Sequence, residues 1–258
     1  DPAPTPSTGP IIYNKGAAVL RMLAAYLGES RFRQAVHDFL TEYQFESASS
    51  EQFWKTVSRS TGISLEEFAE TWIYQPGYPL ISVKREGDTL MLTQTRFAYD
   101  PGLAPVSRWV IPVDILCFFE DGGTKTLQVL LNQSSKAIQL PENVIAYKLN
   151  SDFTGFYRVH YSQDNLKYLG ELIRSQELSA IDSLNVLSDF FALVKAGAYS
   201  VDEYLHYVEI YLTKENRYLA LTDLTKSLSH LYRISRSKRA IISRLGNVIF
   251  EQALDAIG

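Results

Sequence analysis

Tyr13 is the residue of this chain whose type and position are best suited to chemistry. It stands in the run Ile11-Ile12-Tyr13-Asn14-Lys15-Gly16, two residues before a Lys-Gly pair and at the start of an apolar helical pattern. A phenol stays protonated at neutral pH and can donate a hydrogen bond. On this spacing alone, a core or capping tyrosine at a helix start is the simpler interpretation. Lys15 is explained equally well by electrostatic support of a site and by a solvated lysine at a helix start.

The other reactive side chains do not group in the sequence. The histidines stand far apart, and none has a metal-ligand partner three or four residues away: His37, His160, His206 and His230. Each is predicted to be an exposed or hydrogen-bonded histidine rather than a metal ligand. Cys117, the only cysteine, lies in the apolar run 113–119, which indicates a buried structural thiol. The patterns His-Glu-x-x-His, Gly-x-Ser-x-Gly and Gly-x-x-x-x-Gly-Lys-Ser/Thr are all missing from the sequence.

The elements that would position Tyr13 begin with helices. Between residues 13 and 74, apolar side chains recur at helical spacing in four stretches. The capping and stop signals between them are Ser49 with Gln52, Ser64 with Glu67, and the glycines Gly28 and Gly62. The run Gln75-Pro76-Gly77-Tyr78-Pro79 should end helical structure, because proline cannot continue a helix and restricts the residue before it. Four helices and a sharp boundary are predicted.

Between residues 80 and 161 the pattern changes to alternation with a period of two. The predicted strands are 80–85, 88–97, 108–119, 124–131, 135–140, 143–149 and 155–161. Turn residues separate them, for example Gly87-Asp88 and Asp121-Gly122-Gly123. Short strands at this spacing favour a small antiparallel sandwich. Pro112 should lie on an edge strand or at a bulge, since proline cannot donate a ladder hydrogen bond.

After Ser162 the helical period returns in five stretches. Repeated helices of this kind favour an α-solenoid, which buries a continuous core by stacking neighbouring pairs. Because a helical pattern is still running at 241–254, we expect the stack to continue in a longer parent protein. The chain also begins without methionine, which fits a piece of something longer. Residues 1–10 hold four prolines and are expected to be extended, not a signal peptide.

Composition limits the partners of the chain. Its 258 residues carry a formal net charge of −4, and the pI is near 5.6, which argues against a nucleic-acid-binding surface. No apolar stretch approaches the roughly 20 residues needed to span a bilayer. A single cysteine excludes an intrachain disulfide. A cytoplasmic protein without a nucleic-acid partner or a membrane span is expected.

Several short motifs follow one another along the chain. They are Tyr13-Asn14-Lys15-Gly16, Trp72-Ile73-Tyr74-Gln75-Pro76-Gly77-Tyr78-Pro79, Gln94-Thr95-Arg96-Phe97, Gly155-Phe156-Tyr157-Arg158-Val159-x-Tyr161, Leu178-Ser179-Ala180-Ile181-Asp182, and Asp189-Phe190-Phe191-Ala192-Leu193-Val194-Lys195-Ala196-Gly197. In this order they resemble motifs of zinc aminopeptidases of the aminopeptidase-N and puromycin-sensitive type. The resemblance covers nearly the whole chain beyond residue 10.

The resemblance implies a multidomain α and β fold. Residues 1–79 would be the helical end of a thermolysin-like catalytic domain, residues 80–161 a small antiparallel β-sandwich domain, and residues 162–258 the beginning of an α-helical solenoid domain. It also implies that Tyr13 stabilises the oxyanion of the transition state. Zinc and its ligands would belong to the missing N-terminal half of the catalytic domain, so no zinc is expected in this chain. Substrate-binding residues are not assigned.

The function implied by the resemblance is that of a fragment of a zinc metallo-aminopeptidase, which removes N-terminal residues from peptides. The fragment alone is expected to be inactive. The alternative is a catalytically inactive, aminopeptidase-like scaffold for protein–protein binding, and the retained Tyr13 favours the enzyme.

The chain departs from the family's pattern at two places. It has Asp182-Ser183 where the family usually has Asp-Arg, and Ser188-Asp189 where the family often has Asn-Asp. Both departures concern the packing of the helical domain rather than the chemistry. Arg158 is expected to pair with a carboxylate at the domain junction rather than to touch substrate.

Overall fold

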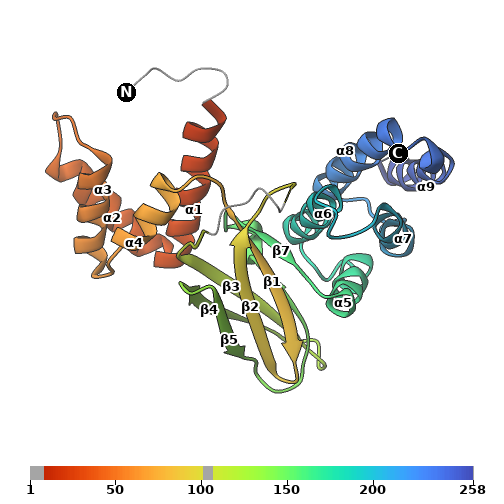
Figure 1. The fold of residues 1–258 in the computed structure, drawn as a ribbon, viewed down its shortest axis with the longest axis horizontal. Coiled ribbons are helices and arrows are strands. Elements are labelled where there is room, and N and C mark those ends of the chain that lie inside the picture. Colours follow the sequence, from red (N-terminus) through yellow and green to blue (C-terminus); the bar gives the residue numbers. More distant parts are fainter. Residues whose placement is uncertain (1–8, 101–106, 258) are drawn as a thin grey trace.

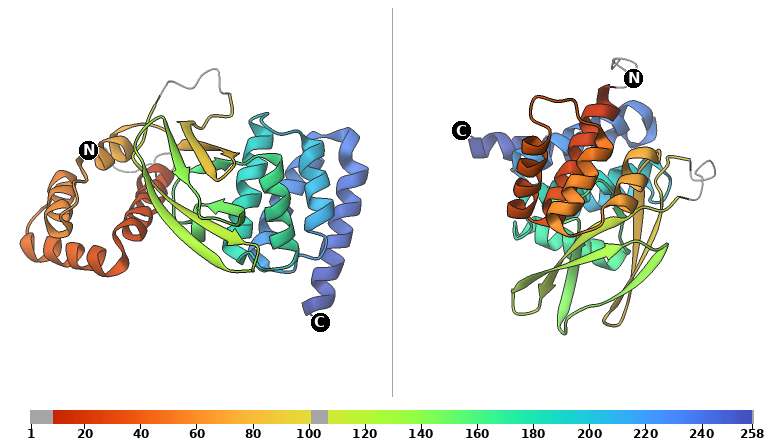
Figure 2. Two further views of the ribbon diagram at one scale, coloured as in Figure 1. Left: turned by 90° about the horizontal axis from the view of Figure 1, so that it is seen from below. Right: turned by 90° about the vertical axis from the view of Figure 1, so that its left-hand side faces the viewer.

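The computed structural model describes residues 9–100 and 107–257 (Figure 1). Two β-sheets lie in the middle, with the N-terminal helices on one side and the C-terminal helices on the other (Figures 1 and 2). Of the first ten residues, which were expected to be extended, residues 1–8 lie outside the described ranges. Gly9 and Pro10 are helical instead, because they lead directly into the first helical segment.

The N-terminal part is helical, as predicted. A π-helix (Pro10–Lys15) leads into α1 (Gly16–Leu27), followed by α2 (Glu29–Glu42), α3 (Ser50–Thr61), α4 (Glu66–Ala69) and a second π-helix (Glu70–Tyr74). Three of the predicted boundaries are confirmed. Ser49 and Gln52 form a reciprocal capping box before α3, and Gly28 and Gly62 have the positive φ angles that favour glycine at helix ends.

The predicted N-cap at Ser64 is wrong. Helix α4 begins at Glu66, and no side chain caps it. The backbone N–H of Leu65 donates to the hydroxyl of Ser58 in α3 at 3.0 Å. A hydroxyl from the neighbouring helix therefore binds a backbone donor at this helix start, where the sequence pattern suggested a local side chain.

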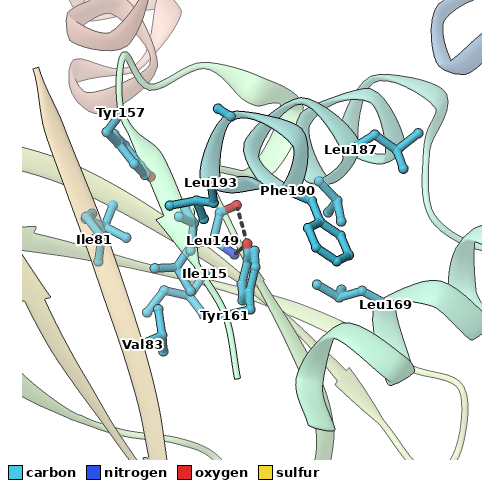
Figure 3. Close-up of a cluster of buried hydrophobic side chains, with 14 of the residues drawn as sticks. Ile81, Val83, Ile115, Leu149, Tyr157, Tyr161, Leu169, Leu187, Phe190 and Leu193 are labelled. Carbon is cyan, nitrogen blue, oxygen red and sulfur yellow. Dashed lines mark hydrogen bonds between the residues drawn. The ribbon is translucent and has the colours of Figure 1, made fainter. Parts of the chain in front are cut away.

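The described residues form seven strands in two sheets. The strands are β1 (Pro79–Glu86), β2 (Thr89–Arg96), β3 (Ile111–Phe119), β4 (Thr124–Leu131), β5 (Ser135–Gln139), β6 (Val144–Leu149) and β7 (Arg158–His160). One sheet has the order β5-β2-β1-β7 and the other β4-β3-β6. Their inner faces meet in a buried cluster that includes Ile81 and Val83 of one sheet and Ile115 and Leu149 of the other (Figure 3).

Besides a shorter last strand, which spans 158–160 where 155–161 was predicted, the sheets differ from the prediction in strand pairing and in the place of a proline. Strand β7 pairs with β1 in parallel, with Ile81 opposite Val159, so the strand pairs are not all antiparallel. Pro112 lies in β3, the middle strand of its sheet, and not on an edge strand. Its position is nevertheless compatible with proline, because β6 pairs with β3 only from Ile115 onward.

The five predicted C-terminal helices are α5 (Gln163–Arg174), α6 (Ala180–Lys195), α7 (Val201–Tyr211), α8 (Tyr218–Ile234) and α9 (Arg239–Ile257). Helix α6 packs against β7 on one side and α8 on the other. Tyr161 belongs to the cluster shared by sheets and helices, and its hydroxyl accepts a hydrogen bond from Leu149 N–H at 2.9 Å (Figure 3). None of the described helices is long and apolar enough to cross a membrane.

Candidate functional site

Tyr13 lies on the π-helix Pro10–Lys15, which continues into α1. Helical segments with this wider turn are rare and often occur at functional sites. The Tyr13 side chain is 66% exposed, and among the described residues none forms a hydrogen bond with its hydroxyl. Tyr13 is therefore not a core tyrosine, and its hydroxyl is free to donate to a bound molecule.

Lys15 ties this segment to the beginning of the first sheet. Its Nζ donates to the backbone carbonyl oxygen of Gln75 at 3.2 Å. The side chain is half-buried, and this burial lowers the pKa of the Lys15 ammonium group. Lys15 is thus not a freely solvated lysine. It holds the segment that carries Tyr13 against the residues that connect the N-terminal helices to β1.

Gln75 borders a surface hollow of about 430 Å³. Its Nε2 donates to the carbonyl oxygen of Arg108 at 3.1 Å. Arg108 Nη2 in turn pairs with Glu67 Oε1 at 2.6 Å. Glu70 and Tyr74 also line the hollow. The connection between the N-terminal helices and the sheet therefore carries several polar side chains. Among them, the Arg108 guanidinium is already paired with the carboxylate of Glu67.

Trp72 fixes the second π-helix to the backbone before β3. Its indole Nε1 donates to the carbonyl oxygen of Val110 at 2.7 Å, and Thr71 Oγ1 accepts from Val110 N–H at 3.2 Å. Gln94 of β2 binds the backbone of Trp109, the residue before Val110. Its Oε1 accepts a hydrogen bond from Trp109 N–H at 2.8 Å. Because these side chains bind the backbone groups at 109–110, strand β3 begins at Ile111, and not at residue 108 as predicted.

Arg158 forms the predicted ion pair between the sheet and the helices. Its Nη1 lies 2.9 Å from Asp189 Oδ1, and Asp189 Oδ2 accepts from Val159 N–H at 3.0 Å. Asp189 is almost completely buried, and burial raises its pKa to about 6 although the Arg158 guanidinium opposes that change. The expectation that Arg158 pairs with a carboxylate at this junction is confirmed.

A second buried ion pair at the same junction was missed from the sequence. Lys148 is fully buried, and its Nζ lies 2.6 Å from Asp182 Oδ1 and 2.8 Å from Asn185 Oδ1. The available signal was a lone lysine in the otherwise apolar strand Val144–Leu149. Such a residue needs a partner, since an unpaired buried charge is very costly.

The two departures from the family's pattern are accommodated in the helical packing. Ser183 is buried, and its hydroxyl accepts a hydrogen bond from Arg217 Nη2 at 3.1 Å. The hydroxyl of Ser188 accepts one from Arg158 Nη1 at 3.4 Å. Serine at both positions is thus used by an arginine that approaches from another element.

The residues that the structure describes do not fit a zinc site. Within 9–100 and 107–257, no three His, Cys, Asp or Glu side chains gather in a way that could hold a metal ion. His160 packs on the ring of Tyr199, and His230 on that of Phe191. Cys117 is buried as predicted, and burial raises the pKa of its thiol, which keeps it unreactive.

Comparison with known proteins finds two families. Residues 7–72, which include Tyr13 and Lys15, match the Peptidase family M1 domain. Residues 146–258 match the ERAP1-like C-terminal domain, and this match begins within β6.

Similar proteins are named as aminopeptidases. "Probable aminopeptidase 1" of Sulfurisphaera tokodaii is 32% identical over 252 residues, which are 96% of this chain and 30% of that protein. "Probable aminopeptidase 1" of Saccharolobus solfataricus is 31% identical over 251 residues, again 96% and 30%. "Aminopeptidase M1-B" of Oryza sativa subsp. japonica is 30% identical over 242 residues, 91% of this chain and 27% of that protein. The chain therefore spans less than a third of the length of these relatives.

Proposed function

This chain belongs to the M1 family of peptidases, and we propose that it is part of an aminopeptidase that removes N-terminal residues from peptides. The observation that carries the proposal is the exposed hydroxyl of Tyr13. It has no hydrogen-bond partner among the described residues, and it lies on a π-helix within the segment that matches the peptidase domain.

In this proposal Tyr13 acts as a hydrogen-bond donor. When a peptide carbonyl is attacked, its oxygen gains negative charge, and a donor aimed at that oxygen stabilises the transition state more than the substrate. A phenol suits this task because it normally keeps its proton at neutral pH. Lys15 supports Tyr13 by fixing the π-helix to Gln75.

The proposal includes zinc in the longer protein, but none of its ligands in this chain. The sequence has no His-Glu-x-x-His, and the described side chains do not form a metal-binding group. The metal ligands and the general base would therefore be supplied by other residues of the enzyme. We assign no step to the metal here.

We further propose the arrangement inferred from the sequence: residues 1–79 complete a catalytic domain, residues 80–161 form a sandwich domain, and residues 162–258 begin a helical domain. Large apolar side chains exposed on the N-terminal helical part support the first of these assignments. They are Ile12, Tyr13, Leu20, Leu40, Phe45, Ile73 and Tyr74. Exposed apolar groups of this number suit contact with the remainder of a catalytic domain. A cytoplasmic location remains part of the proposal.

Peptide hydrolysis by the longer protein tests this function. We expect it to release free N-terminal amino acids from unblocked peptides and none from N-acetylated ones. The 258-residue chain alone should cleave no aminoacyl-arylamide, and elemental analysis should find no stoichiometric zinc. A longer protein that carries an intact His-Glu-x-x-His and still releases no N-terminal residue would reject the enzyme and favour the scaffold.

A further inference from the structure

A hollow of about 490 Å³ lies where β7, α6 and α8 meet. Most of the charged side chains around it are basic: Arg158 of β7, Lys195 of α6, and Lys226 and Arg233 of α8. We call it the basic hollow. We propose that the basic hollow binds a small anion with several oxygen atoms, of the carboxylate or phosphate class. This proposal does not depend on peptidase activity.

Three of these cations are not engaged in ion pairs among the described residues. Within the part of the chain that the structure describes, Lys195, Lys226 and Arg233 form no ion pair with a carboxylate. Lys195 is nevertheless held in place, because its Nζ lies 4.9 Å from the ring centre of Tyr99 and 5.2 Å from that of Phe191. Aromatic faces orient an ammonium group without neutralising it.

Arg158 offers a fixed donor at the wall of the same hollow. Its Nη1 binds Asp189, and its Nε lies 3.4 Å from the hydroxyl of Tyr78. No acceptor among the described residues binds Nη2. A guanidinium anchored through two of its nitrogens loses little freedom when the third binds an oxygen, so it is well prepared to recognise an oxyanion.

The basic hollow contains one carboxylate, that of Asp223. Its Oδ2 is buried and has no hydrogen-bond partner among the described residues. Burial raises the pKa of Asp223, while the nearby Lys226, Arg158 and Lys195 oppose that change. Three free cations thus face a single carboxylate in a chain whose net charge is −4. The excess of positive charge favours an anion, and Asp223 weakens its binding.

Isothermal titration calorimetry tests the proposal on the 258-residue chain, with inorganic phosphate and N-acetylglycine as probes at constant ionic strength. At least one probe should bind saturably, with one site per chain. Lys195→Gln and Arg233→Gln should each weaken binding by about tenfold, the size expected for a lost charged hydrogen bond. Lys125→Gln on β4 and Arg33→Gln on α2 are matched controls, because both side chains are exposed and lie outside the hollow. They should leave the affinity unchanged.

Asp223→Asn should change the affinity for the probe in the opposite direction, and a folding defect would not produce such a gain. Removing its negative charge at constant pH should tighten binding of the same probe. Binding of phosphate alone or of N-acetylglycine alone would each support the site and identify its class of ligand. No saturable binding of either probe, equal weakening in the two controls, or weaker binding by a folded Asp223→Asn chain would each overturn the proposal.

Discussion

Lys15 Nζ donates a hydrogen bond to the backbone carbonyl oxygen of Gln75 at 3.2 Å, although 60 residues separate the two in the sequence. Gln75 is itself bound through its side chain to the carbonyl oxygen of Arg108, in the segment before β3. The π-helix that carries Tyr13 is therefore held against the residues that enter both sheets. This contact links the orientation of Tyr13 to the segments that precede β1 and β3.

The first prediction concerns Lys15 as a positioning residue. In the longer protein, Lys15→Met should lower kcat by about tenfold and change KM much less. The reason is that a misplaced Tyr13 hydroxyl would lose a hydrogen bond that it makes mainly in the transition state. Lys15→Arg keeps a donor and should recover most of kcat. Steady-state kinetics on an aminoacyl-arylamide measure both. Lys55→Met on α3, where the side chain is exposed, is the control and should leave both constants unchanged. A normal kcat in Lys15→Met would show that Lys15 has no part in positioning Tyr13.

The second prediction compares two buried tryptophans. Trp72 and Trp109 are both fully buried, but only Trp72 donates its indole N–H, to Val110, while Trp109 Nε1 has no partner within the described residues. Both Phe variants lose packing, and only Trp72→Phe also leaves a buried carbonyl without its donor. Trp72→Phe should cost about 1–2 kcal/mol more than Trp109→Phe in the free energy of unfolding. Urea denaturation of the two variants measures the difference, and equal losses would contradict this account.

The third prediction is a pH dependence that arises from Asp189. An unfolded aspartate has a pKa of about 3.9, whereas burial raises that of Asp189 to about 6. Between these values the folded chain binds more protons than the unfolded one. The stability contributed by this group is thus present below about pH 4 and is lost as the pH rises through about 6, with a change of about 2–3 kcal/mol.

Asp189→Asn checks this effect, because asparagine does not titrate. Its free energy of unfolding should lie closest to that of the unmodified chain near pH 4, because asparagine resembles the protonated carboxyl, and this part of the pH dependence should vanish. Urea denaturation at a series of pH values between 4 and 7 measures both quantities. A variant that keeps the same slope as the unmodified chain would assign the pH dependence to other groups.

Signals that depend on neighbouring residues were predictable from the sequence. The capping box of Ser49 and Gln52 and the stop at Gly62 involve backbone and side chains within a few positions, so local chemistry decides them. Most strand ranges could likewise be predicted, because the alternation of apolar and polar residues is also a local pattern. The parallel pairing of β7 with β1 did not, because alternation shows which face of a strand is buried and not which strand lies beside it.

The features that could not be predicted from the sequence depend on contacts between distant segments. The buried charge of Lys148 is met by Asp182, 34 residues later in α6, and no local pattern connects the two. The exposure of Tyr13 is likewise a tertiary property. Its residue type and its place before Lys15 indicated a possible donor, but only the packing of the N-terminal helices shows that its hydroxyl is accessible.

The most direct measurement is the turnover of a Tyr13→Phe variant of the longer protein. Because Tyr13 is 66% exposed in the 258-residue chain, loss of its hydroxyl should leave the free energy of unfolding of that chain within about 0.5 kcal/mol of the original. If Tyr13 donates to the oxyanion, kcat should fall by about 10²–10³-fold with unchanged metal content and a much smaller change in KM. A correctly folded Tyr13→Phe enzyme with near-normal kcat would contradict the central claim and reduce Tyr13 to a surface residue.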